Sequence, residues 1–250
     1  MTAPARDTVI LPMAGAGSRL GLPFPKELVP IGPGRVALDA TVDLLAPHAD
    51  RLRVVAVVDE HREATVRHLR ARCAELALPF VTTFQDPALV ESTGAVLSAA
   101  AWFGPATLVL LPDQIPARPE PETIRELLDL IHAGAGAVFL AARETDPARL
   151  AVDGALRLCE DTDGHPAVAD FADKPGLDRA HEFDAVWFGY GFAAHTATTV
   201  LAAMHGHAVR TPQPPHGGDV LIGATVVEMG PFTDLGTWPR LTAHWRRTRS

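Results

Sequence analysis

The segment Leu11-Pro12-Met13-Ala14-Gly15-Ala16-Gly17-Ser18-Arg19-Leu20-Gly21 decides the fold class of this chain. It follows a short apolar run that predicts a strand, Thr8 to Leu11, so the glycines come at the turn after that strand. Gly15 and Gly17 would let backbone N–H groups approach a phosphate chain, because a side chain there would block the approach. Arg19, and Lys26 in the following Pro25-Lys26-Glu27-Leu28, would supply the positive charge that a triphosphate needs.

Two other glycine-rich loops fit this segment less well. A dinucleotide fingerprint needs a glycine three residues after Gly17, where the chain has Leu20. A P-loop needs Gly-Lys-Ser/Thr, which the segment lacks. An ordinary tight turn would explain a bare Gly-x-Gly. The addition of Arg19 and Pro25-Lys26 favours a phosphate site over such a turn.

The first 142 residues alternate short apolar runs with longer helical patterns, which is typical of a parallel sheet covered by helices. Strands are expected near Thr8 to Leu11, Arg53 to Val58, Phe80 to Thr83, Thr107 to Leu111 and Ala137 to Ala142. A helix is expected from Arg62 to Leu76. We therefore expect an α/β fold in a single domain, residues 1–250, whose half 1–142 binds nucleotide.

The half 143–250 has shorter extended segments and should cover the substrate. Strands are expected at Leu156 to Cys159, Ala167 to Ala172, Val186 to Ala193 and Val220 to Val227, and a final helix from about Thr237 to Arg249. Between the first two lies Asp161-Thr162-Asp163, for which a polar hairpin turn is expected.

Composition excludes several classes of function. The formal net charge of −8 argues against a general nucleic-acid binder, which needs a basic face. The two cysteines, Cys73 and Cys159, have no disulfide or zinc-ligand spacing and are expected to be buried. With no signal-peptide pattern and no apolar run of about 20 residues, a soluble cytoplasmic protein without membrane contact is expected.

The pattern Gly-x-Gly-x-Arg followed by Pro-Lys resembles that of the sugar-phosphate nucleotidylyltransferases. Leu-Pro-Met-Ala-Gly with Pro-Lys-Glu-Leu looks closest to the glucose-1-phosphate uridylyltransferases and thymidylyltransferases. The short gap from Arg19 to Lys26 is instead similar to the cytidylyltransferases of isoprenoid-precursor synthesis, which remain an alternative. The resemblance implies a Rossmann-like three-layer sandwich with a mixed, mostly parallel central sheet.

The resemblance also implies roles for residues in the first half and near the end of the chain. Arg19 and Lys26 would be catalytic, and Asp113 and Asp234 would bind Mg²⁺. Asp113 stands in Leu-Leu-Pro-Asp, and Asp234 in Thr-Asp-Leu-Gly-Thr, each similar to a metal-binding motif of the family. The nucleotide-binding residues would be Met13, Ala14, Gly15, Gly17, Gln85, Thr93 and Gly94.

The acceptor side of the resemblance has two departures. Phe171-Ala172-Asp173-Lys174-Pro175 is similar to the family's Glu-Lys-Pro motif, whose lysine binds the sugar phosphate, but the acid here is Asp173. Gly189 would also contact the sugar phosphate, and Phe188 before it is apolar where the family often has a polar residue. These changes leave room for an unusual sugar or another alcohol phosphate.

The implied reaction joins a nucleoside triphosphate, UTP or dTTP by closest resemblance, to a sugar 1-phosphate with release of pyrophosphate. A cytidylyl- or guanylyltransferase is an alternative. A glycosyltransferase is a further alternative, because Asp161-Thr162-Asp163 matches a DxD metal motif. A non-catalytic nucleotide-sensing module is another, because function does not follow from fold. His205-Gly206-His207 could bind a metal, but a solvated loop is the expectation. A homo-oligomer is possible.

Overall fold

The structure is a computed structural model that describes residues 5–15, 20–209 and 219–248. The strands are β1 (Asp7–Pro12), β2 (Pro30–Gly32), β3 (Arg35–Val36), β4 (Leu52–Val58), β5 (Phe80–Phe84), β6 (Ala106–Leu110), β7 (Gln114–Pro116), β8 (Ala137–Arg143), β9 (Gly154–Glu160), β10 (Pro166–Asp173), β11 (Ala185–Ala193), β12 (Thr225–Glu228) and β13 (Phe232–Asp234). The α-helices are α1 (Ala37–Leu45), α2 (Glu63–Glu75), α3 (Glu91–Ser98), α4 (Pro121–His132), α5 (Pro147–Leu150), α6 (Ala197–Ala208) and α7 (Trp238–Thr248). Short 3-10 turns are η1 (Lys26–Leu28), η2 (Ala46–His48), η3 (Ala100–Trp102), η4 (Ala180–Glu182) and η5 (Ala194–Thr196).

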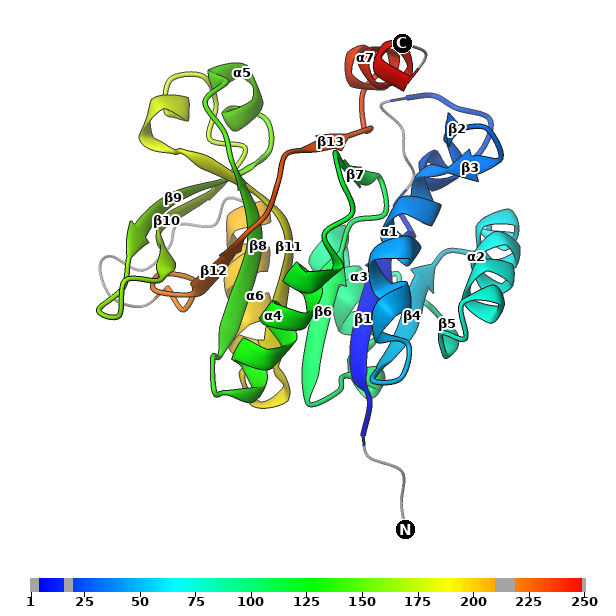
Figure 1. The fold of residues 1–250 in the computed structure, drawn as a ribbon, viewed down its shortest axis with the longest axis horizontal. Coiled ribbons are helices and arrows are strands. Elements are labelled where there is room, and N and C mark those ends of the chain that lie inside the picture. Colours follow the sequence, from blue (N-terminus) through cyan, green and yellow to red (C-terminus); the bar gives the residue numbers. More distant parts are fainter. Residues whose placement is uncertain (1–4, 16–19, 210–218, 249–250) are drawn as a thin grey trace.

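A central nine-stranded sheet runs in the order β5-β4-β1-β6-β11-β8-β12-β10-β9 (Figure 1). β5, β4, β1 and β6 pair in parallel, and β8 pairs in parallel with β12. β11 is antiparallel to both β6 and β8 and separates them. The predicted mixed α/β fold with a central sheet is confirmed, and the glycine-rich segment follows β1 at the carboxyl edge of the parallel strands.

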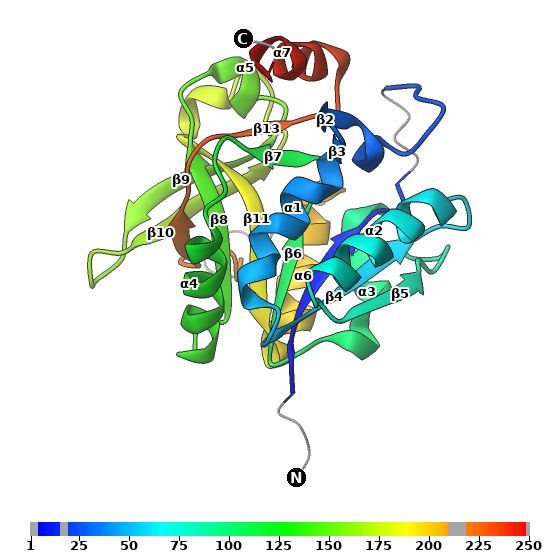
Figure 2. The same ribbon diagram turned by 45° about the vertical axis from the view of Figure 1, so that its right-hand side comes forward.

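Helices lie on both faces of this sheet (Figures 1 and 2). Apolar residues of α1, α2 and α4 share one buried cluster with one face, and those of α3 and α6 share another cluster with the opposite face. In α4 the buried residues Ile124, Leu127, Leu128 and Ile131 recur at three- and four-residue spacing, so a single stripe meets the sheet. The same pattern in the sequence predicted α2 correctly, because Leu69 and Cys73 are buried there.

Most predicted strands are present, but the strand predicted from Val220 to Val227 is wrong in its first half. Only its end is extended, in β12. The preceding residues form a turn, in which the Asp219 carboxylate accepts the N–H of Leu221 at 2.9 Å and Gly223 has a φ of +81°. Short-range bonds of an aspartate to the following backbone favour a turn over a strand, despite the apolar side chains.

Two further expectations are wrong. Cys159 is exposed, since it lies near the end of β9, beyond the residues that pair with β11, whereas Cys73 is buried as predicted. His205-Gly206-His207 is part of helix α6, not a loop, because the apolar residues Val200, Leu201 and Met204 carry the helix into the core. Each of the two histidines has a protein partner: His205 contacts Thr93, and His207 contacts Asp219.

Asp161-Thr162-Asp163 lies in the turn between the antiparallel strands β9 and β10, as expected. One Asp161 carboxylate oxygen accepts the N–H groups of Asp163 and His165, at 2.9 and 2.8 Å. The aspartate therefore closes a hairpin turn.

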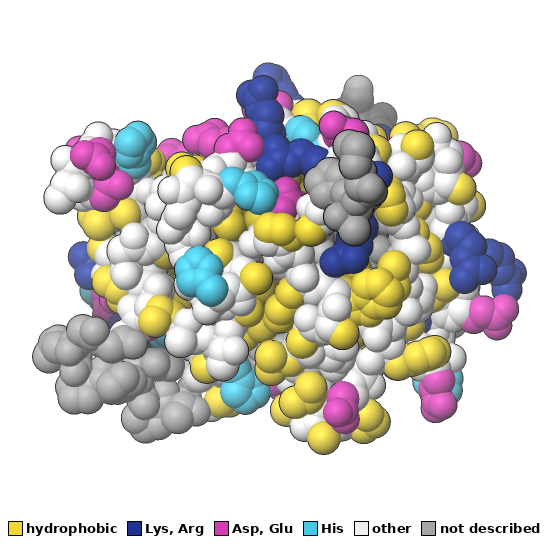
Figure 3. All heavy atoms as spheres, turned by 90° about the horizontal axis from the view of Figure 1, so that it is seen from below, with side chains coloured by type: hydrophobic (Ala, Val, Ile, Leu, Met, Phe, Trp, Pro, Cys, Tyr) yellow, Lys and Arg dark blue, Asp and Glu magenta, His cyan; other side chains and the backbone are white. Residues whose placement is uncertain are grey.

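Figure 3 shows the end of the molecule opposite the glycine-rich segment. Lys and Arg side chains there are interspersed with acidic and uncharged ones, so the described residues of this face form no continuous basic patch. Among the helices that the structure describes, none is both long enough and apolar enough to cross a membrane.

Candidate active site

Lys26 and Asp113 form an ion pair at the carboxyl edge of the parallel strands. Lys26 begins η1, and Asp113 lies between β6 and β7. The Nζ of Lys26 is 2.6 Å from Oδ2 of Asp113, whose side chain is only 5% exposed. The pair joins the segment after β1 to the segment after β6, which are neighbouring strands of the sheet. Sequence analysis predicted both residues as functional, and the fold brings them into contact.

Asp234 meets the same site from the end of the chain. β13 pairs antiparallel with β7 so that Asp234 lies opposite Gln114, and the carbonyl of Asp113 accepts the N–H of Leu235 at 2.9 Å. A Cβ added at Gly236 would lie 2.8 Å from an Asp234 carboxylate oxygen and 3.7 Å from one of Asp113. Both carboxylates therefore face the small space left by this glycine.

The charges of this group perturb each other. Burial raises the pKa of Asp234, and the nearby charge of Asp113 raises it further. Burial by itself would lower the pKa of Lys26, but the charge and hydrogen bond of Asp113, with the charge of Asp234, raise it above its ordinary value. Lys26 is therefore a cation at neutral pH, held between two carboxylates that repel each other.

The acidic pair is also the best candidate for a metal site. Mg²⁺ prefers carboxylate oxygens and is usually held by one or two of them, with waters and substrate phosphates completing the shell. Asp113 and Asp234 provide such a pair. The described part of the chain contains no cluster of three or more His, Cys, Asp or Glu residues that could hold a metal ion alone.

Arg62, which sequence analysis passed over, holds the start of the glycine-rich segment. It is 8% exposed and lies just before α2. Its Nε donates to the carbonyl of Met13 at 2.7 Å, and its Nη2 donates to the carbonyl of Gly15. Glu27, 1% exposed, lies 3.5 Å away and also accepts a bond from Thr65. A side chain that binds remote carbonyls belongs to no sequence motif, so no pattern along the chain predicts this role for Arg62.

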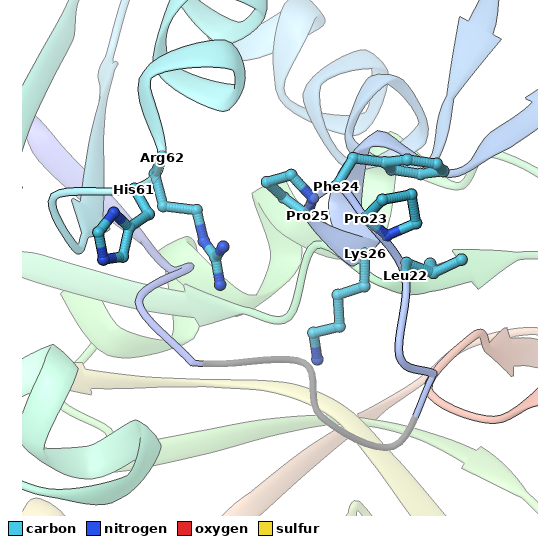
Figure 4. A pocket seen from close by; sticks show the side chains of 7 residues that line it. All are labelled: Leu22, Pro23, Phe24, Pro25, Lys26, His61 and Arg62. Atoms are coloured by element: carbon cyan, nitrogen blue, oxygen red, sulfur yellow. The ribbon is translucent and has the colours of Figure 1, made fainter.

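A cavity of about 190 Å³ opens beside this group, lined by Leu22, Pro23, Phe24, Pro25, Lys26, His61 and Arg62. Figure 4 shows the side chains of Lys26, in η1, and of Arg62, just before α2, among the residues that line this cavity. Two permanent cations and a histidine beside the glycine-rich segment make this cavity suited to an anionic group.

Of the predicted nucleotide-binding residues that the structure describes, Met13, Gly15, Gln85 and Thr93 bond to protein groups. Met13 is buried, Ala14 is half-buried and Gly15 is exposed, while Gly17 and Arg19 lie outside the described residues. Gln85 donates from its amide to the carbonyl of Leu89 at 2.6 Å.

The loop that contains Leu89 explains why position 94 in the segment Ser92-Thr93-Gly94-Ala95 is a glycine. A Cβ added at Gly94 would lie 2.4 Å from the backbone of Leu89, so only glycine fits. The hydroxyl of Thr93, on the same helix, pairs with His205 at 2.9 Å. Gln85 and Gly94 thus fix this loop against α3, whereas Thr93 joins α3 to α6.

The predicted acceptor residues belong to two strands of the second half: Asp173 ends β10, and Gly189 lies in the middle of β11. Lys174 follows β10, has a φ of +53° and pairs through Nζ with Asp173 at 2.8 Å. Gly189 lies in β11, where a Cβ would come within 2.6 Å of Leu110, so packing against β6 requires the glycine. Phe188 is completely buried against Phe232. Its side chain is therefore part of the core.

The chain is similar to known proteins in its three-dimensional structure. No protein-family model and no curated protein matches the sequence. Among solved structures, a putative glucose-1-phosphate thymidylyltransferase from Bacillus anthracis, in complex with a sucrose, has a TM-score of 0.70 at 20% identity and covers 98% of this chain and 96% of its own. The UTP-bound UGPase from Acinetobacter baumannii has a TM-score of 0.70 at 17% identity, covering 97% and 93%. A UDP-glucose pyrophosphorylase complexed with UDP-glucose has a TM-score of 0.70 at 14% identity, covering 98% and 97%.

The chain shares the fold of these three structures. The likeness extends over nearly the whole length of both partners in each comparison. At these identities the likeness establishes the fold, and the chemistry must be argued from the site.

Proposed function

We propose that this protein is a sugar-phosphate nucleotidylyltransferase, which joins a nucleoside triphosphate to a sugar 1-phosphate and releases pyrophosphate. The observation that carries the proposal is the convergence of Lys26, Asp113 and Asp234, from three distant segments, beside the glycine-rich turn. The three solved structures that share the fold support it, because they are a putative glucose-1-phosphate thymidylyltransferase, a UTP-bound UGPase and a UDP-glucose pyrophosphorylase complexed with UDP-glucose. UTP or dTTP is the favoured nucleotide.

The architecture proposed with this function is a Rossmann-like three-layer sandwich in a single domain. Residues 1–142 would bind the nucleotide and residues 143–250 the sugar phosphate. The reaction uses small charged substrates only, and we propose that it takes place in the cytoplasm.

In the proposed reaction an oxygen of the sugar phosphate attacks the α-phosphorus of the nucleotide. A new P–O bond forms, and the bond from the α-phosphorus to the bridging oxygen breaks to release pyrophosphate. The nucleophile is already an anion, so the site needs no general base. It must instead neutralise charge and align two anions that repel each other.

Each charged residue has a part in that task. Mg²⁺ held by Asp113 and Asp234 would neutralise charge on the phosphate oxygens. Lys26, together with Arg19, would contact the triphosphate and the charge that develops on pyrophosphate. Lys174 would hold the acceptor phosphate beside Asp173, and Gly189, on β11, would contact the sugar phosphate. Met13, Ala14, Gly15 and Gly17 would follow the nucleotide, and Gln85, Thr93 and Gly94 would lie near its base.

The test is pyrophosphate release with Mg²⁺, measured separately with ATP, CTP, GTP, UTP and dTTP against a set of sugar 1-phosphates. Release with UTP or dTTP that is lost in Asp113→Asn, with the variant folded as judged by circular dichroism, is the expected result. Consumption of a nucleotide sugar without pyrophosphate release would instead identify a glycosyltransferase. Nucleotide binding without turnover for any acceptor would favour a sensing module.

A further inference from the structure

Arg240, on the first turn of α7, forms a two-pronged ion pair with Asp153. Its Nη1 and Nη2 donate to the two carboxylate oxygens of Asp153 at 2.8 and 3.0 Å. Both side chains are largely buried, 23% and 13% exposed. Paired donors on a planar guanidinium fix the orientation of a carboxylate as well as its distance. Neither residue belongs to a motif that sequence analysis identified.

Asp153 in turn holds the backbone at Lys174. The carbonyl of Asp153 accepts the N–H of Lys174 at 3.1 Å, and the nearby carbonyl of Ala151 accepts the N–H of Gly176 at 3.0 Å. Lys174 needs such support because its φ of +53° is costly for a residue with a side chain. The segment before β9 therefore fixes the turn from which the Lys174 side chain extends.

Arg240 also lies beside the acidic pair. Its Nη1 is 3.6 Å from Oδ1 of Asp234, the oxygen that accepts the N–H of Gly236. The rest of α7 is anchored independently, since Leu241 is buried and Trp238 donates to the carbonyl of Leu20. Arg240 thus connects the Asp234 carboxylate with the turn at Lys174. Its helix, α7, is held in place by other residues.

We propose that Arg240, acting through Asp153, is a positioning residue that sets the distance between the Asp234 carboxylate and the Lys174 side chain. This inference rests on the proposed function, because only a reaction between two separately held phosphates requires that distance to be fixed. Two reactants are productive only within a narrow range of separation, so a small displacement of one anchor lowers the rate strongly.

The first experiment does not depend on activity. Hydrogen–deuterium exchange is measured at the amides of Lys174 and Gly176 in Arg240→Met, with Arg51→Met as the matched control. Arg51 also joins two carboxylates, of Asp7 and Asp129, with its side chain 30% exposed. Exchange at both amides should be about tenfold faster in Arg240→Met and unchanged in Arg51→Met. Equal exchange in wild type and Arg240→Met would overturn the proposal.

The second experiment separates positioning from general stability. Arg240→Met should lower kcat/KM for the sugar 1-phosphate roughly tenfold to a hundredfold, while the dissociation constant for the nucleotide stays within about twofold of wild type. Asp153→Asn should have at least as large an effect, because it also loses the bond that Asp153 accepts from Arg149 at 3.3 Å. The double variant should lose little more than Asp153→Asn alone, because the Arg240 connection is already broken in it. Arg240→Lys should recover only part of the activity, since one ammonium cannot reproduce the two-pronged pair.

The two experiments can fail independently of the proposed function. Absence of turnover in the wild type would reject that function, while the exchange experiment would still decide whether Arg240 fixes the lysine turn. Losses that affect nucleotide and acceptor equally, or that add in the double variant, would overturn the positioning role.

Discussion

Replacement of Arg62 by methionine should destabilise the protein strongly, although Arg62 lies in no recognisable motif. The guanidinium of Arg62 is buried and donates to the carbonyls of Met13 and Gly15. Methionine keeps most of the aliphatic packing but none of the donors. The carbonyl of Met13 is then left unpaired in the interior, whereas Gly15 is exposed and its carbonyl can bond to water.

The magnitude follows from these contacts. Loss of a hydrogen bond to a charged donor, with a buried carbonyl left unpaired, costs about 2–3 kcal/mol. Glu27 also loses its buried cation at 3.5 Å, which adds to this cost. We expect a total of about 3–4 kcal/mol, a large part of the about 5–15 kcal/mol that usually stabilises a domain.

Urea unfolding followed by tryptophan fluorescence measures this loss. With a slope of about 3 kcal/mol per molar urea, the midpoint should fall by about 1 M. Arg67→Met is the control, because Arg67 lies on α2, which Arg62 precedes, with its side chain 75% exposed and paired with Glu63 at the surface. Adding Glu27→Gln to Arg62→Met should recover part of the loss. If Arg62→Met unfolded at the same urea concentration as Arg67→Met, the structural role assigned to Arg62 would be refuted.

Three further predictions concern the same site. Lys26→Gln should bind Mn²⁺ about tenfold more tightly than wild type in electron paramagnetic resonance titrations, because its ammonium no longer competes for the Asp113 carboxylate at 2.6 Å; unchanged affinity would contradict the metal role of that carboxylate. Gly94→Ala should unfold at lower temperature than wild type, since its Cβ would meet backbone at 2.4 Å, whereas Gly32→Ala, with open space, should not. Burial raises the pKa of Glu27 above its ordinary value of 4.5, so the folded state binds a proton at Glu27 more tightly than the unfolded state does. The free energy of unfolding therefore falls as the pH rises from 4.5 through the folded pKa. The stability advantage of Glu27→Gln over wild type should therefore grow with pH over that window, and an advantage that shrinks would reverse the sign of the argument.

The sequence by itself determined the class of fold and the main elements of the charged site. Hydrophobic periodicity depends on local geometry, so β1, β4, β6 and α2 could be read from it. The resemblance to the sugar-phosphate nucleotidylyltransferases indicated Lys26, Asp113 and Asp234 as a group.

Only the tertiary structure decided which groups support that site. Insertion of β11 between β6 and β8, the bonds of Arg62 to remote carbonyls, and the connection of Arg240 through Asp153 all join segments far apart in the chain. Hydrogen bonds to backbone carbonyls require a donor at the right place but no particular neighbouring sequence. Such contacts leave no periodic or motif signal, and they become visible only when the chain is folded.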